Sequence, residues 1–334
     1  MTLLYVTSNE RGAGKTSLCV GLAHLLTKQG KRVTIFKPIG TSDDDPDVAI
    51  YQALLSTEVD GWPIISASGA ISDDLLGQIK TAAIGVAEDQ DVVIVEGSSD
   101  ISAADAGKLA EALDAKAVVV SRYSSERKAF EFRKWQDAFK GRLLGYVING
   151  VSMYQGTASK SGLLESMANE GMKSLGAVPE DRRLLGVSVN QLSEHLGGEY
   201  LADGGDRDSL VEYLMVGGMS LDPGEIYFGI HDNRAVVVRG DRPDIQMAAL
   251  SATGTTACLV LTNGVKPIGY VQNEAELEEV PLVLVSEGTL GTMENLNSLM
   301  EHGRFDHPAK LERFARLMEE HIDVKAIATA LEPG

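Results

Sequence analysis

The chain has 334 residues, enough for two domains that each bury a core of their own. Hydrophobic residues make up 44% of it and charged residues 23%, which excludes wholesale disorder. The formal net charge of -18 repels nucleic acid and anionic lipid, so we expect small-molecule or protein ligands and no nucleic-acid or membrane partner.

The cysteines and the hydropathy pattern favour a cytoplasmic protein. Cys19 and Cys258 lie in different halves of the chain and predict neither a disulfide framework nor a metal cluster, which fits a reducing compartment. The sequence shows no basic leader and no apolar run approaching ~18 residues.

Up to about residue 180, short β-branched runs alternate with amphipathic segments, a pattern typical of a mostly parallel sheet flanked by helices. Between the first two strands, leucines on one helical face followed by Gly30 predict a helix and complete a βαβ unit. The predicted strands are Leu3–Ser8, Val33–Pro38, Asp91–Glu96, Ala117–Ser121, Leu143–Asn149 and Met172–Val178.

A glycine-rich stretch at about 188–234 interrupts this alternation and indicates a domain boundary. We therefore predict a nucleotide-binding domain at residues 1–187, a connector at 188–215 and a smaller α/β domain at 216–334. An amphipathic helix after Pro308 is expected to pack onto the preceding sheet. The strands of the second domain are predicted at Ala235–Arg239, Ala257–Thr262 and Pro281–Ser286.

The most specific motif is the segment from Ser8 to Ser17, which follows the first strand and opens the first helix. Its end, Gly14-Lys15-Thr16, matches the G-x-x-x-x-G-K-[ST] phosphate loop, in which backbone N–H groups face the phosphates. Asn9 replaces the first glycine and tolerates positive φ. A glycine-rich turn without a nucleotide is the alternative. The predicted ATP-binding residues here are Gly12, Gly14, Lys15, Thr16 and Ser17, with Thr16 also a Mg²⁺ ligand.

Charged residues follow the neighbouring strands at the same edge of the predicted sheet. Glu96 closes a buried strand and is expected to hold Mg²⁺ directly or through water. Asp47, in the acidic run 43–47, is a second metal candidate or alternatively a helix N-cap. Lys37 ends the second strand, where a buried lysine is costly without an anion, so we expect it to contact the γ-phosphate.

These motifs together resemble dethiobiotin synthetase and the cobyrinate amidotransferase synthases over about residues 1–185. The resemblance rests on the order of Gly14-Lys15-Thr16, Lys37-Pro38-Ile39, Val95-Glu96-Gly97, Ile148-Asn149 and Val178-Pro179-Glu180. It implies that Lys15 and Lys37 contact the transferred phosphate as catalytic residues, and that Asp47 and Glu96 bind Mg²⁺. It also implies adenine recognition by Asn149, nucleotide contacts from Pro179 and Glu180, and a substrate-side hydroxyl at Thr41.

Two departures from these relatives narrow the resemblance. Where dethiobiotin synthetases usually carry Glu-Gly-Ala-Gly-Gly, this chain has Glu96-Gly97-Ser98-Ser99-Asp100, which disfavours dethiobiotin synthesis itself. Glu10 stands where partition-type ATPases carry an extra lysine, which disfavours that branch.

The basic stretch Arg122–Arg142 is interpreted as a solvated helix face rather than a nucleic-acid groove.

The whole chain resembles the non-catalytic N-terminal portion of long bacterial phosphate acetyltransferases, which joins a dethiobiotin-synthetase-like domain to a DRTGG domain. Arg239–Ile245 carries the corresponding signature after a strand, and Asn263 departs from the family's Thr-Gly-Gly. The acyltransferase domain is not in this sequence, so phosphotransacetylation by this chain alone is not expected. Asp241 and Arg242 suit a second nucleotide or anion effector, or else a helix cap and a structural ion pair.

The sequence leaves two main functions open. The first is a regulatory or sensing module that binds Mg²⁺-ATP. The second is an ATP-dependent synthetase or ligase that phosphorylates a carboxylate or carbamate, and the retained pair Lys15 and Lys37 favours it. A scaffold with an inactive site is a third alternative. Resemblance to dimeric relatives implies a homodimer.

Overall fold

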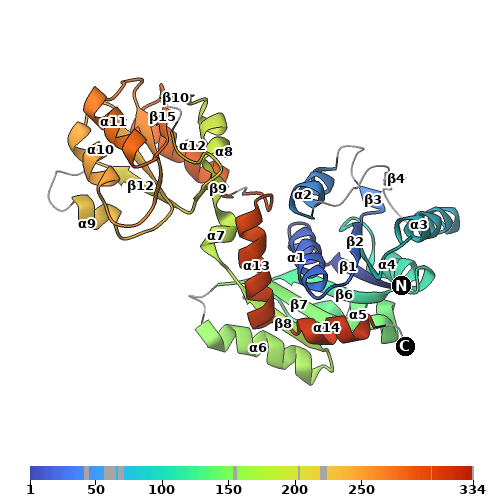
Figure 1. Ribbon diagram of the computed structural model, residues 1–334. Helices are drawn as coiled ribbons and strands as arrows, with labels where there is room; N and C mark the ends of the chain where they lie inside the picture. Colours follow the sequence, from blue (N-terminus) through green and yellow to red (C-terminus); the bar gives the residue numbers. More distant parts are fainter. Residues whose placement is uncertain are drawn as a thin grey trace. The chain divides into compact units, whose positions relative to one another are not determined.

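The computed structural model describes residues 1–40, 45–55, 65–66, 71–152, 156–201, 204–218, 224–301 and 303–332. The chain divides into two compact units (Figure 1). Met1–Asp181 and Phe305–Gly334 form the first, and Arg182–Arg304 forms the second. Thr41, predicted near the substrate, lies outside the described residues.

The first unit is built on a six-stranded sheet in the order β2-β5-β1-β6-β7-β8, with every pairing parallel. The strands are β1 (Thr2–Ser8), β2 (Val33–Phe36), β5 (Val92–Glu96), β6 (Lys116–Arg122), β7 (Leu143–Val151) and β8 (Ser174–Pro179). Every residue of β5 is buried, as expected for a parallel strand covered on both faces. The predicted sheet of six parallel strands flanked by helices is confirmed.

Helices cover both faces of this sheet (Figure 1). They are α1 (Lys15–Lys28), α2 (Pro46–Leu55), α3 (Asp73–Val86), α4 (Ala103–Ala112), η1 (Ala129–Phe132), α5 (Arg133–Phe139), η2 (Lys140–Arg142), α6 (Gly156–Asn169), α13 (Pro308–His321) and α14 (Val324–Ala330). The short strands β3 (Ile39–Gly40) and β4 (Ile65–Ser66) pair separately.

The strand register brings the predicted functional residues to one edge of the sheet. β1 lies between β5 and β6, with Val6 opposite Glu96 and Ser8 opposite Val120. The carboxyl end of β5 is therefore next to the point where β1 passes into the loop before α1. Parallel α/β sheets bind ligands at this edge.

The C-terminal helices belong to the first unit, whereas the sequence assigned them to the second domain. Helix α13 packs against α1 and β8. Its Met318 and Phe314 approach Gly21 of α1 so closely that a Cβ there would lie 2.4 Å from the Met318 sulfur. The apolar face of α13 was evident in the sequence, but its partner was not, because a stripe of apolar residues does not specify which surface it covers.

The second unit holds a five-stranded sheet in the order β10-β15-β14-β13-β12, parallel except for β10. Its strands are β10 (Glu199–Tyr200), β12 (Tyr213–Gly217), β13 (Arg234–Arg239), β14 (Thr256–Thr262) and β15 (Leu282–Leu284), with β9 (Val187–Ser188) and β11 (Leu210–Val211) paired apart. Its helices are α7 (Arg182–Leu185), α8 (Val189–Leu196), α9 (Gly224–Phe228), α10 (Pro243–Leu250), α11 (Gly269–Leu277) and α12 (Thr289–Glu301).

The predicted connector at 188–215 is instead part of this second unit. It contributes α8 and β10, and β12 begins within it. Its glycines serve turns: Gly197 ends α8 in the left-handed conformation, and Gly205 has φ +84°. The high glycine content of residues 188–215 therefore reflects sharp turns within the second unit and not a linker between domains. Within the described ranges, every helix is too short or too polar to span a bilayer.

Candidate functional site

The loop between β1 and α1 has the backbone conformation that its glycines predict. Gly12 and Gly14 have φ of +69° and +94°, and Gly14 is the N-cap of α1. A Cβ on Gly14 would lie 2.2 Å from Nδ2 of Asn149, which comes from the carboxyl half of β7. The Asn149 amide donates to the Ala13 carbonyl at 3.0 Å. Asn149 therefore supports the loop in this structure, and its predicted contact with adenine stays a prediction.

Lys15 opens α1, and its ammonium is largely buried under the loop. It donates to Ser8 Oγ at 2.9 Å and to Ser99 Oγ at 2.6 Å. Burial lowers the pKa of Lys15, and the nearby Glu96 carboxylate opposes that shift. Ser99 was not predicted as a site residue, although its place three residues after Glu96 in the sequence was a usable signal.

Glu96 is the buried carboxylate of the site, with 1% of its surface exposed. The Thr16 hydroxyl donates to Oε1 at 3.0 Å, and the Tyr51 hydroxyl from α2 donates to Oε2. Burial raises the pKa of Glu96 to about 7, with a further increase from the charge of Asp47. The sequence around Tyr51 carries no local signal that connects it to the end of β5, so its place in the site could not be predicted.

Lys37 lies just after β2 and is also buried. Its ammonium donates to Asp45 Oδ1 at 2.8 Å and to Asp47 Oδ2. Burial acts to lower the pKa of Lys37, but hydrogen bonds to Asp45 and Asp47 outweigh it and raise the pKa. Asp45 also accepts from the Asp47 N–H at 3.0 Å, so the cap at the start of α2 comes from Asp45, not from Asp47 as the alternative prediction had it.

The oxygen atoms at this edge suit Mg²⁺ in chemical type. Thr16 supplies a hydroxyl, and Glu96 and Asp47 supply carboxylates around the same two lysines. Mg²⁺ usually takes one or two carboxylates and completes its shell with phosphate and water. In the described part of the chain, no group of three or more His, Cys, Asp or Glu side chains could hold a metal ion by itself. An ion here would therefore depend on phosphate oxygens.

The other predicted nucleotide residues lie at the same edge of the sheet. Ser17 is half-buried in the first turn of α1. Pro179 ends β8, and the Glu180 N–H donates to the Val151 carbonyl at 2.9 Å. The Glu180 carboxylate lies 3.8 Å from the Arg122 guanidinium. Nucleotide contacts by Ser17, Pro179 and Glu180 stay predictions.

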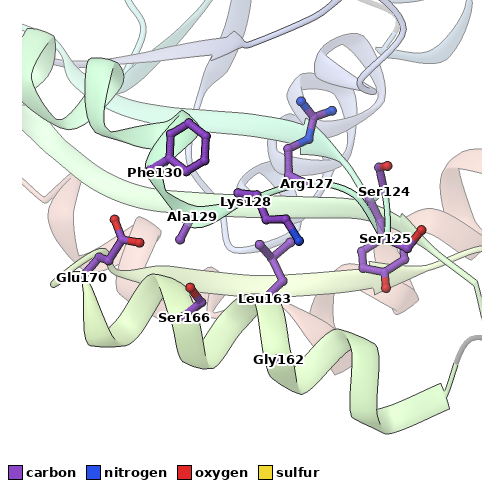
Figure 2. Close-up of a pocket in the computed structure, with 11 residues that line it drawn as sticks. Ser124, Ser125, Arg127, Lys128, Ala129, Phe130, Gly162, Leu163, Ser166 and Glu170 are labelled. Carbon is purple, nitrogen blue, oxygen red and sulfur yellow. The ribbon is translucent and has the colours of Figure 1, made fainter.

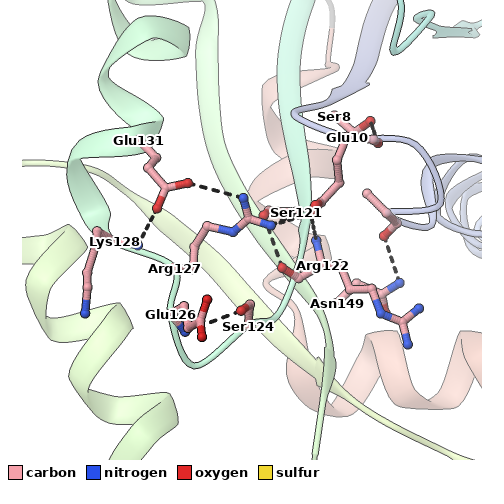
Figure 3. Close-up of polar contacts among 11 residues, drawn as sticks. Ser8, Glu10, Ser121, Arg122, Ser124, Glu126, Arg127, Lys128, Glu131 and Asn149 are labelled. Carbon is pink, nitrogen blue, oxygen red and sulfur yellow. Dashed lines mark hydrogen bonds and ion pairs between the residues drawn. The ribbon is translucent and has the colours of Figure 1, made fainter.

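Glu10, the loop residue that stands in place of a lysine, is fixed within its own unit (Figure 3). It accepts two hydrogen bonds from the Arg127 guanidinium, at 2.7 and 2.8 Å, and one from the Arg122 N–H at 3.1 Å. Arg127 also contacts Glu131 at 3.3 Å and has only 15% of its side chain exposed. The prediction of a solvated basic face over Arg122–Arg142 is therefore wrong at Arg127, because an acid distant in sequence pairs with its guanidinium.

In the second unit, Asp241 and Arg242 follow β13, where α10 begins. Arg239 Nε donates to Asp241 at 2.9 Å, and Arg242 Nε donates to Asp244 at 3.0 Å. Arg242 is the N-cap residue of α10, so the capping role considered for Asp241 is not seen. The structural ion pair considered for Arg242 is present, with Asp244 as its partner.

Two family models match the chain, and together they span most of it. The AAA domain model matches residues 2–187, and the DRTGG domain model matches residues 191–299. The first match covers more than half of the sequence. The chain belongs to the AAA domain family. Its AAA domain contains the phosphate loop and the six-stranded sheet described above.

Beyond the AAA domain, nearly the whole chain is similar to about half of each of several phosphate acetyltransferases. The enzyme of Nitratidesulfovibrio vulgaris is 23% identical over an alignment 372 residues long. The alignment covers 98% of this chain and 51% of that protein. The enzyme of Deinococcus radiodurans is 26% identical over 367 residues, with coverages of 100% and 52%. The chain thus spans about half the length of the curated relatives it matches. The predicted relationship to phosphate acetyltransferases, with a P-loop domain followed by a DRTGG domain, is confirmed, and the family model identifies the P-loop domain as an AAA domain.

Solved structures similar to parts of the chain have low sequence identity. Cobyrinic acid a,c-diamide synthase from Mycobacterium smegmatis with bound ADP and magnesium is 20% identical, covers 55% of this chain and 87% of its own, and has a TM-score of 0.37. The CBS and DRTGG domains of Clostridium perfringens pyrophosphatase, complexed with the activator diadenosine tetraphosphate, are 12% identical, with coverages of 47% and 74% and a TM-score of 0.30.

Proposed function

We propose that the chain is a regulatory or sensing module that binds Mg²⁺-ATP at the loop between β1 and α1. The observation that carries the proposal is the arrangement of Lys15, Thr16 and Glu96 around one loop. Lys15 and Thr16 begin α1 behind two glycines of positive φ, and Thr16 already contacts the buried Glu96. Backbone N–H groups at such a helix N-terminus favour phosphate.

Each residue of this site has a proposed part in binding. The Lys15 ammonium now donates to two neutral hydroxyls, those of Ser8 and Ser99, and anionic phosphate oxygens are stronger acceptors. Thr16, Asp47 and Glu96 would hold Mg²⁺, which when bound offsets the charge of the phosphates. Asn149, Pro179 and Glu180 are proposed to contact the adenine nucleoside.

Isothermal titration of the full chain with ATP and Mg²⁺ tests this function. We expect saturable binding that Lys15→Ala weakens at least tenfold, because a charge-assisted hydrogen bond contributes about 1.5–3 kcal/mol. Lys28→Ala, at the exposed far end of the same helix, is the matched control and should bind as the parent does. Absence of binding, or equal effects of the two substitutions, would refute the proposal.

A second candidate function is an ATP-dependent synthetase or ligase that phosphorylates a carboxylate or carbamate. The observation that favours it is Lys37, a second buried cation, which Asp45 and Asp47 hold at the same edge of the sheet. In this reaction Lys15 and Lys37 would both stabilise the transferred phosphoryl group. Substrate-dependent ADP release across a panel of carboxylates and diamines, lost in Lys37→Met, would support it. ADP release independent of every substrate would count against it.

A second nucleotide or anion site at Asp241 and Arg242 and a homodimer complete the proposal. An anion at this site would compete with Asp244 for the Arg242 guanidinium, which is partly exposed to solvent and can therefore be reached by a ligand. Nucleotide binding that persists in Lys15→Ala and disappears in Lys15→Ala with Arg242→Ala would support a second site. Sedimentation equilibrium tests the homodimer, and a monomer mass at every concentration would exclude it.

A further inference from the structure

A pocket of about 630 Å³ opens on the first unit between the loop after β6 and helix α6 (Figure 2). Its volume lies within the roughly 300–1,000 Å³ that small-molecule sites occupy. The loop after β6 and the start of η1 line one side, and α6 lines the other. The lining residues are Tyr123, Ser124, Ser125, Arg127, Lys128, Ala129 and Phe130 from the first side, and Gly162, Leu163, Ser166 and Glu170 from α6.

Lys128 gives this pocket a cation that no acid neutralises among the residues the structure describes. Its ammonium extends into the pocket over Leu163 (Figure 2). The backbone N–H of Lys128 donates to Glu131, but its ammonium makes no hydrogen bond with the described residues. The hydroxyls of Tyr123, Ser125 and Ser166 likewise make no hydrogen bond with the described residues. The pocket therefore presents one charged donor and several neutral ones to a ligand.

The acid in the lining does not reduce this positive character. Glu170 accepts from Arg133 Nε at 2.9 Å, on a residue outside the pocket. The apolar side chains of the lining come from both sides: Leu163 of α6 is buried, and Phe130 of η1 is 62% exposed. In a chain with a net charge of -18, these local donors must supply the attraction for an anion.

We propose that this pocket binds a small organic carboxylate and that its ligand acts on the phosphate loop through Arg127 and Glu10. The carboxylate would accept hydrogen bonds from Lys128 and the hydroxyls, and the apolar part would lie against Phe130 and Leu163. A carboxylate fits better than a phosphate group, because a single ammonium with neutral donors matches one negative charge.

Arg127 connects the pocket to the phosphate loop. It lines the pocket, but its guanidinium turns away from Lys128 (Figure 2) and holds Glu10 by two hydrogen bonds (Figure 3). The Ser8 hydroxyl donates to the Glu10 carbonyl at 2.6 Å and accepts from Lys15 at 2.9 Å. A ligand that displaces the pocket loop therefore moves Arg127, the direct partner of Glu10 in the phosphate loop that precedes Lys15. Coupling of this kind is reciprocal between the two ligands.

Calorimetric titration with benzoate, without nucleotide, tests the pocket. We expect saturable binding that Lys128→Ala weakens about tenfold or more, and no binding of benzamide, the neutral analogue of the same shape. Lys134→Ala is the matched control, since this lysine is exposed and lies 5.8 Å from the Trp135 ring rather than in the pocket. Equal affinity for benzamide, equal effects of the two lysine substitutions, or no saturable binding of benzoate would overturn the assignment.

The action of the pocket ligand on the phosphate loop rests on the proposed nucleotide site and is tested by a separate measurement. We expect saturating benzoate to change the dissociation constant of Mg²⁺-ATP at least fivefold. Glu10→Gln should remove this change while leaving benzoate binding intact. Unchanged ATP affinity in the parent, or coupling that persists in Glu10→Gln, would overturn the connection. If ATP itself fails to bind, the proposed function fails, and the benzoate titration still decides the pocket.

Discussion

Replacing Gly14 by alanine tests how the phosphate loop is held. Gly14 has φ +94°, a left-handed conformation that costs an L-residue about 1–2 kcal/mol. Its new Cβ would lie 2.2 Å from Asn149 Nδ2, so the amide has to move. That movement breaks the 3.0 Å hydrogen bond to the Ala13 carbonyl, which contributes about 1 kcal/mol. We therefore expect the free energy of unfolding to fall by about 2–3 kcal/mol.

Gly12→Ala is the matched control within the same loop. Gly12 also has positive φ, +69°, but a Cβ there meets no atom within 4 Å. Only the backbone strain of about 1–2 kcal/mol should appear, so the two variants should differ by about 1 kcal/mol. In an Asn149→Ala background that difference should vanish, because the contact that causes it is gone.

Urea unfolding followed by tryptophan fluorescence suits this comparison. Both tryptophans belong to residues 1–181, and Trp135, which is buried in the first unit, supplies the signal for its unfolding. Equal losses of stability in Gly12→Ala and Gly14→Ala would refute the reasoning. So would a difference that persists in the Asn149→Ala background.

Three further predictions use the same unfolding assay. The pKa of Glu96 is raised from 4.5 to about 7, so the folded state holds this proton more tightly than the unfolded state does. The free energy of unfolding should therefore fall by about 3 kcal/mol as pH rises through that range. Glu96→Gln should remove this pH dependence, and a pH dependence retained in the variant would contradict the prediction. Phe314→Ala should destabilise the first unit by about 3–5 kcal/mol because the ring is buried. If the urea concentration at which the first unit unfolds stays the same, α13 does not stabilise this unit. Arg11→Ala, which breaks an exposed ion pair with Asp100, should lower the free energy of unfolding by less than about 1 kcal/mol. A larger decrease would contradict the interpretation of this contact as an ordinary exposed ion pair.

The sheet of the first unit could be predicted because its signals are local. Each strand is a short run of β-branched residues, and the motif at Gly14-Lys15-Thr16 carries its own strand and helix. The edge at which Glu96 and Lys37 meet then follows from parallel pairing alone. Strand ends differed from the prediction by no more than two residues, as at β8, Ser174–Pro179, predicted as Met172–Val178.

What could not be predicted depends on pairs of residues far apart in the sequence. Arg127 is largely shielded from solvent and paired with Glu10, 117 positions earlier. The buried Lys37 did indicate an anionic partner, but whether a phosphate or a carboxylate of the same chain fills that place is not encoded in the lysine itself. In the structure, Asp45 and Asp47 do.

The return of the chain to its first unit has a consequence for the order of folding. Because α13 is made after residues 182–304, the side chains that cover Gly21 of α1 are synthesised only after the whole second unit has been synthesised. Residues 1–181 therefore cannot complete their packing until the C-terminal helices have been made. The surface of α1 around Gly21 stays exposed to water, or to another protein, for the time needed to make 123 further residues, which at about 5–20 residues per second is roughly 6 to 25 seconds.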